Sequence, residues 1–492
     1  MYNSNLPEVK LGIVAVSRDC FPKELSYTRC KAVVDEYGKY GNIFRVEDVV
    51  ENERDVVHAI DTLRAAGVNA LVVYLGNFGP EAPETLLAER FDGPVMFAAA
   101  AEERIAVLKS DRGDAFCGLL NACYNLGLRG LTPYLPAYPV GDAGEVAEMI
   151  AEFVPIARTY LGVRHLKIIT FGPRPQDFFA CNAPIAPLYR LGVNIEENSE
   201  LDLLLAFDKH ANDPRIGAVV KDMACELGTG NHMPDLLPQL AQFELTLLDW
   251  MEEHKGAAQY VAFANKCWPA FQHSFKFVPC YVNSRLTAQG IPVSCEVDIY
   301  GTLSEFIGQV VSDDIVTLLD INNSVPKDMY KESIEGKFDY TLKDTFMGFH
   351  CGNTASSKLS FCEMKYQMIM ARSLPIEVTN GTLEGDIKPG DITFYRLQST
   401  ADNKLRAYIA HGEVLPVATR SFGAIGVFAI PEMGRFYRHV LIEGGFPHHG
   451  AVAFGHFGKA LFEVFKYIGV PVEEIGYNQP AGVRYPTENP WG

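Results

Sequence analysis

The stretch VKLGIVAV at residues 9–16 predicts a buried β-strand, because it is a short and nearly continuous apolar run. The chain that follows alternates helical patterns with further apolar runs, which we expect at residues 24–40, 42–46, 53–66, 70–75 and 94–99. Strands separated by helix-length segments are joined by parallel crossovers. The sequence therefore predicts an open α/β sheet with helices on both faces and with ligands at the carboxyl ends of its strands.

A second α/β unit follows the first. A long helical pattern at residues 143–160 leads into a new apolar strand at 166–170. The pattern then continues through an expected helix at 236–253 and an apolar run at 260–264. We therefore expect two open α/β domains of Rossmann-like architecture in succession.

The pattern of the sequence changes after about residue 312. Apolar β-rich runs at 392–397 and 405–410 are separated by turn residues that include Asp402-Asn403, a pattern typical of antiparallel hairpins. A helix expected at 451–467 closes this part. The predicted domains are an N-terminal α/β domain at 1–162, a second α/β domain at 163–312 carrying Glu296, and a mostly antiparallel β domain with a terminal helix at 313–492 carrying Asp320 and His449.

The composition narrows the classes of partner. The 492 residues are 48% apolar and 21% charged, which is typical of a globular protein, and the net charge is −18. A chain so acidic, without a basic cluster, repels nucleic acid and anionic lipid. We therefore expect a small neutral ligand or a cation held by carboxylates, and neither nucleic acid nor membrane as a partner.

The cysteines and the N-terminal sequence predict a cytoplasmic location. Eleven cysteines are scattered without a C-x-x-C pair, which favours reduced thiols in a chain of this size. The first residues do not have the pattern of a secretion signal, and no apolar run approaches the ~20 residues of a transmembrane helix.

Several familiar catalytic motifs are absent from the sequence. It contains no G-x-x-x-x-G-K-[ST], no H-E-x-x-H and no G-x-S-x-G motif, and GNFGP at 76–80 lacks the spacing of a dinucleotide-binding loop. Nucleotide binding, zincin hydrolysis and serine-esterase chemistry therefore lack their usual signals.

Carboxylates and histidines occur instead where the chain changes structure. Glu296 precedes a helical pattern, and Asp320 follows the apolar run at 316–319. His350 lies at another strand end, and His448 and His449 lie on a Gly/Pro-rich loop. Two carboxylates and an imidazole suit Mn²⁺ or a similar divalent ion. An aspartate at a strand end is also often a helix cap or a turn former.

Two segments carry a resemblance to a known family. CEVD at 295–298 and LDINN at 319–323 resemble, in sequence and separation, the metal-carboxylate motifs of the L-fucose isomerases. The pair His448-His449 after Gly444-Gly445 resembles the Gly-Gly-x-His-His motif of the L-arabinose isomerases, although a phenylalanine and a proline are added in this loop. Further similar segments are GPRPQDF at 172–178, KCWP at 266–269, FHCGN at 349–353 and GTLEG at 381–385.

The resemblance to the L-fucose and L-arabinose isomerase superfamily implies a reaction class. It implies a metal-dependent aldose–ketose isomerase that moves a proton between C1 and C2 of a free pentose or 6-deoxyhexose, such as L-fucose, D-arabinose or L-arabinose, through an enediol. The implied metal ligands are Glu296, Asp320 and His449, with Mn²⁺ as the expected ion. In this interpretation Glu296 and Asp320 are also the catalytic acid and base.

The roles of the other candidate residues stay open. His350 is a metal ligand, a hydrogen-bond donor to the sugar or a structural histidine, and His448 is a substitute ligand or supports His449. Asn353 has a polar end suited to sugar hydroxyls, and Trp268 offers a face for sugar stacking or for core packing. Arg18 resembles an arginine that family members lend to a neighbouring subunit, or it forms a surface salt bridge.

The resemblance also implies a homo-oligomer, a trimer or a hexamer, with the active site near a subunit interface. Two alternatives to an isomerase remain. Another metal-dependent sugar enzyme, an aldolase or a dehydratase, would use the same chelated enediolate. A non-catalytic sugar-binding protein would also have tandem α/β domains, but it would need no pair of carboxylates.

Overall fold

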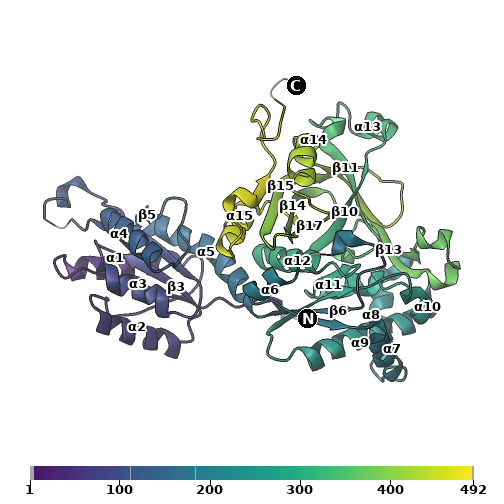
Figure 1. Ribbon diagram of the computed structural model, residues 1–492, viewed down its shortest axis with the longest axis horizontal. Helices are drawn as coiled ribbons and strands as arrows, with labels where there is room; N and C mark the ends of the chain where they lie inside the picture. Colours follow the sequence, from purple (N-terminus) through teal and green to yellow (C-terminus); the bar gives the residue numbers. More distant parts are fainter. Residues whose placement is uncertain (1–4, 111, 183, 490–492) are drawn as a thin grey trace. The chain divides into compact units, whose positions relative to one another are not determined.

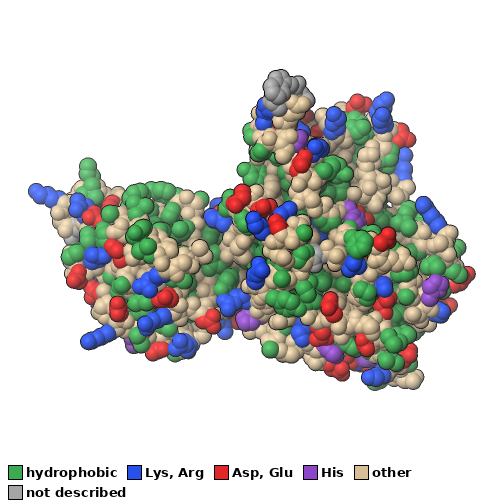
Figure 2. Space-filling view, viewed as in Figure 1, with side chains coloured by type: hydrophobic (Ala, Val, Ile, Leu, Met, Phe, Trp, Pro, Cys, Tyr) green, Lys and Arg blue, Asp and Glu red, His purple; other side chains and the backbone are tan. Residues whose placement is uncertain are grey.

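The computed structural model describes residues 5–110, 112–182 and 184–489, and the chain forms two compact units (Figure 1). One unit spans Pro7–Leu161, and the other spans Gly162–Gly492 together with the first six residues. Asn5 belongs to the second unit, where its side-chain amide donates to the carbonyl of Val261 at 2.7 Å. Charged side chains of both signs are interspersed over the face of each unit that Figure 2 shows.

The first unit contains a five-stranded parallel sheet with the strand order β2-β1-β3-β4-β5. Its order reverses between β1 and β3, the kind of switch point at which α/β sheets bind ligands. The strands are β1 Leu11–Val16, β2 Ile43–Arg45, β3 Ala70–Leu75, β4 Val95–Ala100 and β5 Val140–Gly141. The helices are α1 Lys23–Tyr37, α2 Glu53–Ala65, α3 Glu81–Arg90, α4 Ala115–Leu128 and α5 Ala143–Arg164, the last of which runs on into the second unit.

The second unit begins with a four-stranded parallel sheet in the order β7-β6-β8-β9. Its strands are β6 Leu166–Phe171, β7 Asn194–Asn198, β8 Tyr260–Asn265 and β9 Val293–Cys295. Its helices are α6 Ala186–Leu191, α7 Glu200–Lys209, α8 Ile216–Leu227, α9 Leu237–His254, α10 Phe271–Phe275, α11 Cys280–Ala288 and α12 Ile299–Ser312. The first two sheets thus confirm the predicted succession of open α/β folds.

A nine-stranded, mostly antiparallel sheet completes the second unit, in the order β12-β13-β16-β11-β10-β17-β14-β15-β18. Because β15 also pairs with β16, six of these strands close into an antiparallel barrel. The strands are β10 Val316–Ser324, β11 Thr345–His350, β12 Glu363–Tyr366, β13 Asn380–Asp386, β14 Gly390–Ser399, β15 Leu405–Leu415, β16 Ala424–Ala429, β17 His449–Phe454 and β18 Ile475–Tyr477. The associated helices are α13 Lys327–Ser333, α14 Met433–Phe436, a π-helical turn at Tyr437–Ile442 and α15 Gly458–Tyr467.

Helix α12 joins the two sheets of the second unit. It packs against β8 of the parallel sheet and against β10, β14 and β17 of the barrel, as Figure 1 illustrates. All of its residues from Tyr300 to Val311 are buried, which is typical of a helix enclosed on every side. The turn that precedes α12 is therefore held between the two layers.

Two expectations about secondary structure need correction. The helix expected at 451–467 begins only at Gly458, and residues 451–453 belong to β17 between β10 and β14. The helix-forming alanines there are overridden by burial in the middle of the barrel. Strand β10 continues to Ser324, so Asp320 lies within the strand, where its buried half ends.

The mostly antiparallel third sheet agrees with the predicted fold class, and the hairpin expected around Asp402-Asn403 is confirmed between β14 and β15. The domain boundary at residues 312 and 313 stays a prediction. None of the described helices has the length and apolar character needed to span a membrane.

Candidate metal centre

Three side chains from separate segments converge on one point in the second unit. Glu296 lies in the turn between β9 and α12, Asp320 on β10 and His449 at the start of β17. The Nε2 atom of His449 lies 3.3 Å from Oε2 of Glu296 and 3.3 Å from Oδ1 of Asp320. Asp320 and His449 are direct partners in the antiparallel pairing of β10 with β17, so the register of the sheet sets their approach.

The backbone before α12 is strained where it presents Glu296. Glu296 and Val297 have φ values of 61° and 59°, in the left-handed region that non-glycine residues rarely adopt. Asp298 fixes this turn, because its Oδ1 atom accepts a hydrogen bond from the backbone N–H of Gly301 and caps α12. Such strain is typical of functional sites whose surroundings hold the backbone in place.

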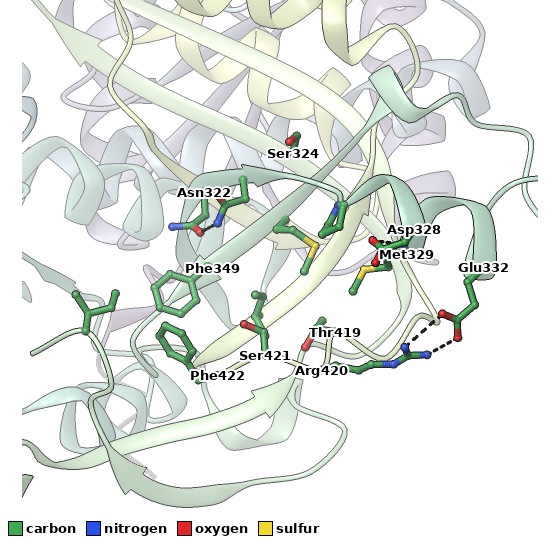
Figure 3. Close-up of a pocket in the computed structure, with 15 residues that line it drawn as sticks. Asn322, Ser324, Asp328, Met329, Glu332, Phe349, Thr419, Arg420, Ser421 and Phe422 are labelled. Atoms are coloured by element: carbon green, nitrogen blue, oxygen red, sulfur yellow. Dashed lines mark hydrogen bonds and ion pairs between the residues drawn. The ribbon is translucent and has the colours of Figure 1, made fainter. Parts of the chain in front are cut away.

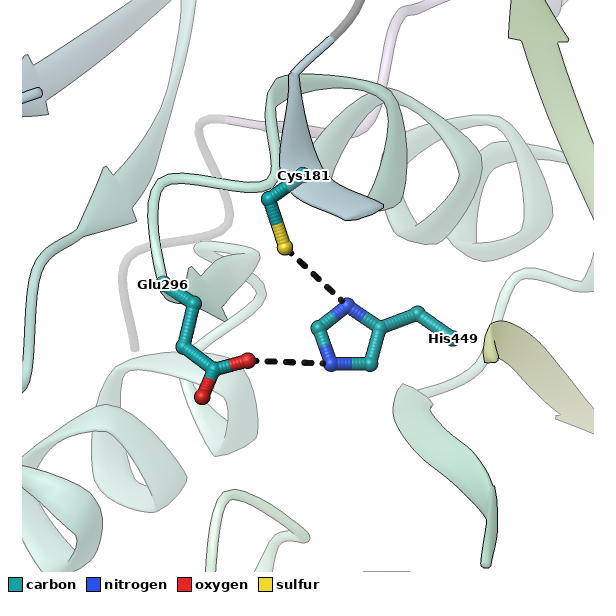
Figure 4. A group of neighbouring side chains, drawn as sticks. All are labelled: Cys181, Glu296 and His449. Carbon is teal, nitrogen blue, oxygen red and sulfur yellow. Dashed lines mark hydrogen bonds and ion pairs between the residues drawn. The ribbon is translucent and has the colours of Figure 1, made fainter. Parts of the chain in front are cut away.

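One oxygen of Glu296 is held by Trp268. The indole Nε1 of Trp268 donates to Oε1 of Glu296 at 3.0 Å, while Oε2 faces His449 (Figure 4). Burial alone would raise the pKa of Glu296, but His449 and this hydrogen bond outweigh it and lower the pKa. Burial and His449 oppose each other in the same way at Asp320, whose pKa is also lowered. Both carboxylates are therefore ionised at neutral pH.

The donor atoms fit a divalent cation. The Nε2 atom of His449 and Oδ1 of Asp320 are buried and make no hydrogen bond with the described residues, although they lie close together. A buried polar atom without a partner is costly unless a ligand satisfies it. Two carboxylates and an imidazole are the donors that Mn²⁺ and similar ions accept.

The second ring nitrogen of His449, Nδ1, contacts side chains on the side away from Glu296 and Asp320. Nδ1 lies 2.8 Å from Oδ2 of Asp298 and 3.8 Å from the sulfur of Cys181 (Figure 4). Burial alone would lower the pKa of His449, but Asp298, Asp320 and Glu296 raise it well above its usual range. Arg396 donates to both oxygens of Asp298 at 2.8 Å and is completely buried.

Sequence reasoning missed Asp298, Arg396 and Cys181 as parts of this site. Asp298 lies only two residues after Glu296 within CEVD, so the motif itself pointed to it. Arg396 left a weaker signal, a single cation within an expected apolar strand. Cys181 left none, because it lies in a short 3₁₀ turn without a motif.

The two other candidate histidines lie beside the centre. His350 is buried, its ring centroid lies 5.8 Å from that of His449, and its Nδ1 accepts the backbone N–H of Cys351. Burial lowers the pKa of His350, so its ring is neutral and carries its proton on Nε2. His448 reaches Asp320 with Nε2 at 3.8 Å and packs edge-on against Phe178.

A cavity of about 430 Å³ opens beside Glu296. Its lining includes Glu296, His350 and Trp268 together with the apolar Ile369, Met370 and Leu374. The described residues of the lining include no lysine or arginine. Trp268 also packs edge-on against Phe178, with the ring centroids 6.1 Å apart. The cavity therefore offers a mainly apolar space lined by one ionised carboxylate, that of Glu296, and by two histidines, His273 and the neutral His350.

Asn353 and Arg18 lie elsewhere. Asn353 is completely buried, and its side-chain amide donates to the carbonyl of Val293 on β9 at 2.6 Å. Arg18 belongs to the first unit, where it donates to the carbonyl of Gly79, pairs with Glu81 at 3.4 Å and covers the ring of Phe78. Its side chain remains about one-third exposed.

A second cavity of about 530 Å³ follows the exposed half of β10 (Figure 3). Asn322, Asn323 and Ser324 line it together with Phe349 and Phe422. Arg420 at its rim pairs with Glu332 at 2.5 Å, as the dashed lines in Figure 3 mark. Ile369 lines this cavity and also the one beside Glu296.

Comparison with known families agrees with this architecture. Residues 12–164 match the N-terminal domain of the fucose/sulfoquinovose isomerases, and residues 348–476 match the C-terminal domain of the L-fucose isomerases. The chain belongs to the L-fucose isomerase-like family. His350 and His449 lie within the second matched segment, whereas Glu296 and Asp320 lie between the two.

Individual relatives within the L-fucose isomerase-like family extend the match to most of the chain. A sulfoquinovose isomerase from Priestia megaterium is 22% identical over 93% of this chain and 97% of its own length. A sulfoquinovose isomerase from Alkalicoccus urumqiensis is 24% identical over 70% of this chain and 72% of its own. The members of this family are aldose–ketose isomerases, and the chain is accordingly an intramolecular oxidoreductase of this kind.

Proposed function

We propose that the protein is a Mn²⁺-dependent isomerase that interconverts a free aldose and its ketose by proton transfer between C1 and C2. The observation that supports this most strongly is the approach of Glu296 and Asp320 to Nε2 of His449, each at 3.3 Å, while Nε2 and Oδ1 of Asp320 are buried without a hydrogen-bond partner among the described residues. These three side chains would hold the ion. A bound divalent cation supplies positive charge that stabilises the oxygens of the enediol and offsets the two carboxylates.

Glu296 is suited to accept the proton from C2. It lines the cavity and is ionised, and its Oε1 atom is held by Trp268 so that the carboxylate has one orientation. Asp320 reaches the centre from β10 and is the second proton carrier in this proposal. The neutral His350 lines the same cavity, and in this proposal its Nε2–H donates a hydrogen bond to a sugar oxygen.

The substrate proposed is a neutral pentose or 6-deoxyhexose, such as L-fucose, D-arabinose or L-arabinose. The apolar part of the cavity and the lack of a lysine or arginine among its described lining residues favour an uncharged sugar with an apolar end. A second candidate is sulfoquinovose, because the curated relatives are named for it. Its sulfonate would need a cation from outside this cavity, and Arg420 or a neighbouring subunit's Arg18 would supply one.

We also propose that the working form is a cytoplasmic homo-oligomer, a trimer or a hexamer, with Arg18 reaching the site of a neighbouring subunit. The exposure of Arg18 in its own unit and the resemblance to the L-fucose isomerases support this assignment.

The deciding experiment incubates the purified protein with Mn²⁺ and a panel of free aldoses in heavy water. Product formation and deuterium at carbon are followed by ¹H NMR, and sulfoquinovose is included beside the neutral sugars. We expect one ketose to form with deuterium incorporated and no product from the Glu296→Gln variant. A ketose formed without any deuterium would point to a hydride shift instead of proton transfer, and unchanged activity in Glu296→Gln would reject the assigned site.

A further inference from the structure

Each ring nitrogen of His449 faces a different set of carboxylates. Nε2 faces the two ligand carboxylates, while Nδ1 lies 2.8 Å from Oδ2 of Asp298. An ionised carboxylate only accepts hydrogen bonds, so this contact requires the proton on Nδ1. The lone pair that remains on the neutral ring is then the one on Nε2, directed at the ion. Asp298 thereby selects the tautomer of His449.

Asp298 in turn accepts hydrogen bonds from the guanidinium of Arg396 at both of its oxygens. Arg396 on β14 donates from two nitrogens to the two oxygens of Asp298, each at 2.8 Å, and both side chains are buried. The same guanidinium donates to the backbone carbonyl of His449 at 3.2 Å and, through Nε, to Oε1 of Gln398 at 2.9 Å. Arg396 therefore positions His449 both through Asp298 and through its main chain.

These contacts join three segments of the chain. Asp298 follows the strained turn that presents Glu296 and caps α12, Arg396 comes from β14, and His449 opens the neighbouring strand β17. A charge pair buried so completely is weak support for stability, because the cost of removing two charges from water offsets their attraction. A role in fixing geometry explains its presence better.

We infer that Arg396 and Asp298 are positioning residues of the metal centre, which orient His449 and hold its proton on Nδ1 so that Nε2 is free for the ion. This inference rests on the proposed function and deepens it. In this inference both residues act on the centre through His449 and not by contact with the ion or the substrate.

Two variants separate positioning from a purely structural role. Asp298→Asn keeps the size of the side chain and its ability to cap α12, since asparagine caps as well as aspartate. It also lets an amide N–H face Nδ1, which would favour the wrong tautomer. Because this variant leaves Arg396 buried without its counter-ion, the double variant Asp298→Asn/Arg396→Gln is also needed, in which no charge is left unpaired.

The test measures Mn²⁺ affinity by isothermal titration calorimetry and thermal stability by calorimetry, on the full chain stripped of metal. We expect both variants to bind Mn²⁺ 10–100-fold more weakly than the wild type, the range reported when groups behind a metal ligand are lost. The melting temperature should fall in Asp298→Asn and recover in the double variant, while the affinity stays low.

The outcomes are distinct. If the double variant recovers both the melting temperature and wild-type Mn²⁺ affinity, the pair is structural only and the inference is overturned. If the wild type itself does not bind Mn²⁺, the proposed function fails and the inference fails with it. If Asp298→Asn does not fold, the double variant alone decides between the two roles.

Discussion

Trp268 donates its indole N–H to Oε1 of Glu296 at 3.0 Å, so a residue for which the sequence left sugar stacking and core packing open holds the carboxylate proposed as the base. The hydrogen bond stabilises the ionised form of Glu296 and leaves its other oxygen directed at His449. The KCWP segment in the sequence indicated Trp268 as a candidate site residue. Its contact with Glu296 depends on the strained turn at Glu296, which no local sequence pattern predicts.

Replacing Trp268 with phenylalanine should raise the pKa of Glu296. A hydrogen bond to a charged group contributes about 1.5–3 kcal/mol, which corresponds to a shift of about 1–2 pH units. Since the base must be ionised, the acidic limb of the pH profile of kcat/KM should move to higher pH. Trp250→Phe is the matched control, because the buried indole nitrogen of Trp250 has no hydrogen-bond partner among the described residues. An unshifted limb in Trp268→Phe would argue against Glu296 as the base.

Neutralising either ligand carboxylate should abolish turnover without unfolding the chain. Glu296→Gln and Asp320→Asn keep side-chain size but remove charge from a centre that needs it, and we expect kcat to fall at least about 10³-fold. Glu305→Gln is a suitable control, since Glu305 is a buried carboxylate on α12 whose pKa burial raises well above its usual range. Burial thus favours the uncharged form of Glu305, so glutamine should replace it with little effect on kcat. Circular dichroism checks that all three variants are folded.

Metal removal should affect activity and stability together. Treatment with a chelator should eliminate isomerisation, and added Mn²⁺ should restore it. A ligand present at 100 times its dissociation constant stabilises the folded state by about 2.7 kcal/mol. Hydrogen exchange should therefore slow with Mn²⁺ in peptides of β10 and β17 but not in those of the first unit. Equal protection in both units would indicate that the ion binds elsewhere.

The first unit should lose stability as the pH rises. Burial and the neighbouring Glu81 raise the pKa of Glu84 to about 8, whereas an unfolded glutamate ionises near 4.5. The folded state thus holds a proton that the unfolded state releases, and stability falls from about pH 4.5 until Glu84 itself ionises, by up to about 5 kcal/mol. Hydrogen exchange in α3 and β3 should show this loss, and Glu84→Gln should flatten it. A pH-independent exchange in the wild type would contradict the prediction.

A shared active site can be tested by mixing subunits. If Arg18 completes the active site of a neighbouring subunit, Arg18→Ala and Glu296→Gln remove residues that two different subunits supply to one site. Co-refolded mixtures should then regain a fraction of wild-type activity through hybrid oligomers, with a maximum near equal proportions. Absence of recovery at every ratio would place Arg18 outside the site.

Local sequence patterns predict most of the fold but only part of the candidate site. The α/β succession follows from short apolar runs alternating with helical patterns, as at residues 9–16, and the β-rich third sheet follows from its turn residues. The misassigned segment at 451–453 reads as a helix because its alanines favour one, and only its place in the barrel makes it a strand. The contact of Asp298 with Arg396 spans 98 residues, and pairings over such distances depend on tertiary packing.

The pairing of Asp320 with His449 across β10 and β17 has a consequence for how this chain can vary. Two histidines stand side by side at 448 and 449, but only His449 belongs to β17, where the register places it opposite Asp320 and brings its Nε2 atom to 3.3 Å from Oδ1 of that residue. His448 comes just before the strand, and its Nε2 atom lies 3.8 Å from the same oxygen. An insertion or deletion within β17 that shifted this register by one residue would move His449 away from the position opposite Asp320, so the pairing of the two strands constrains the length of this segment.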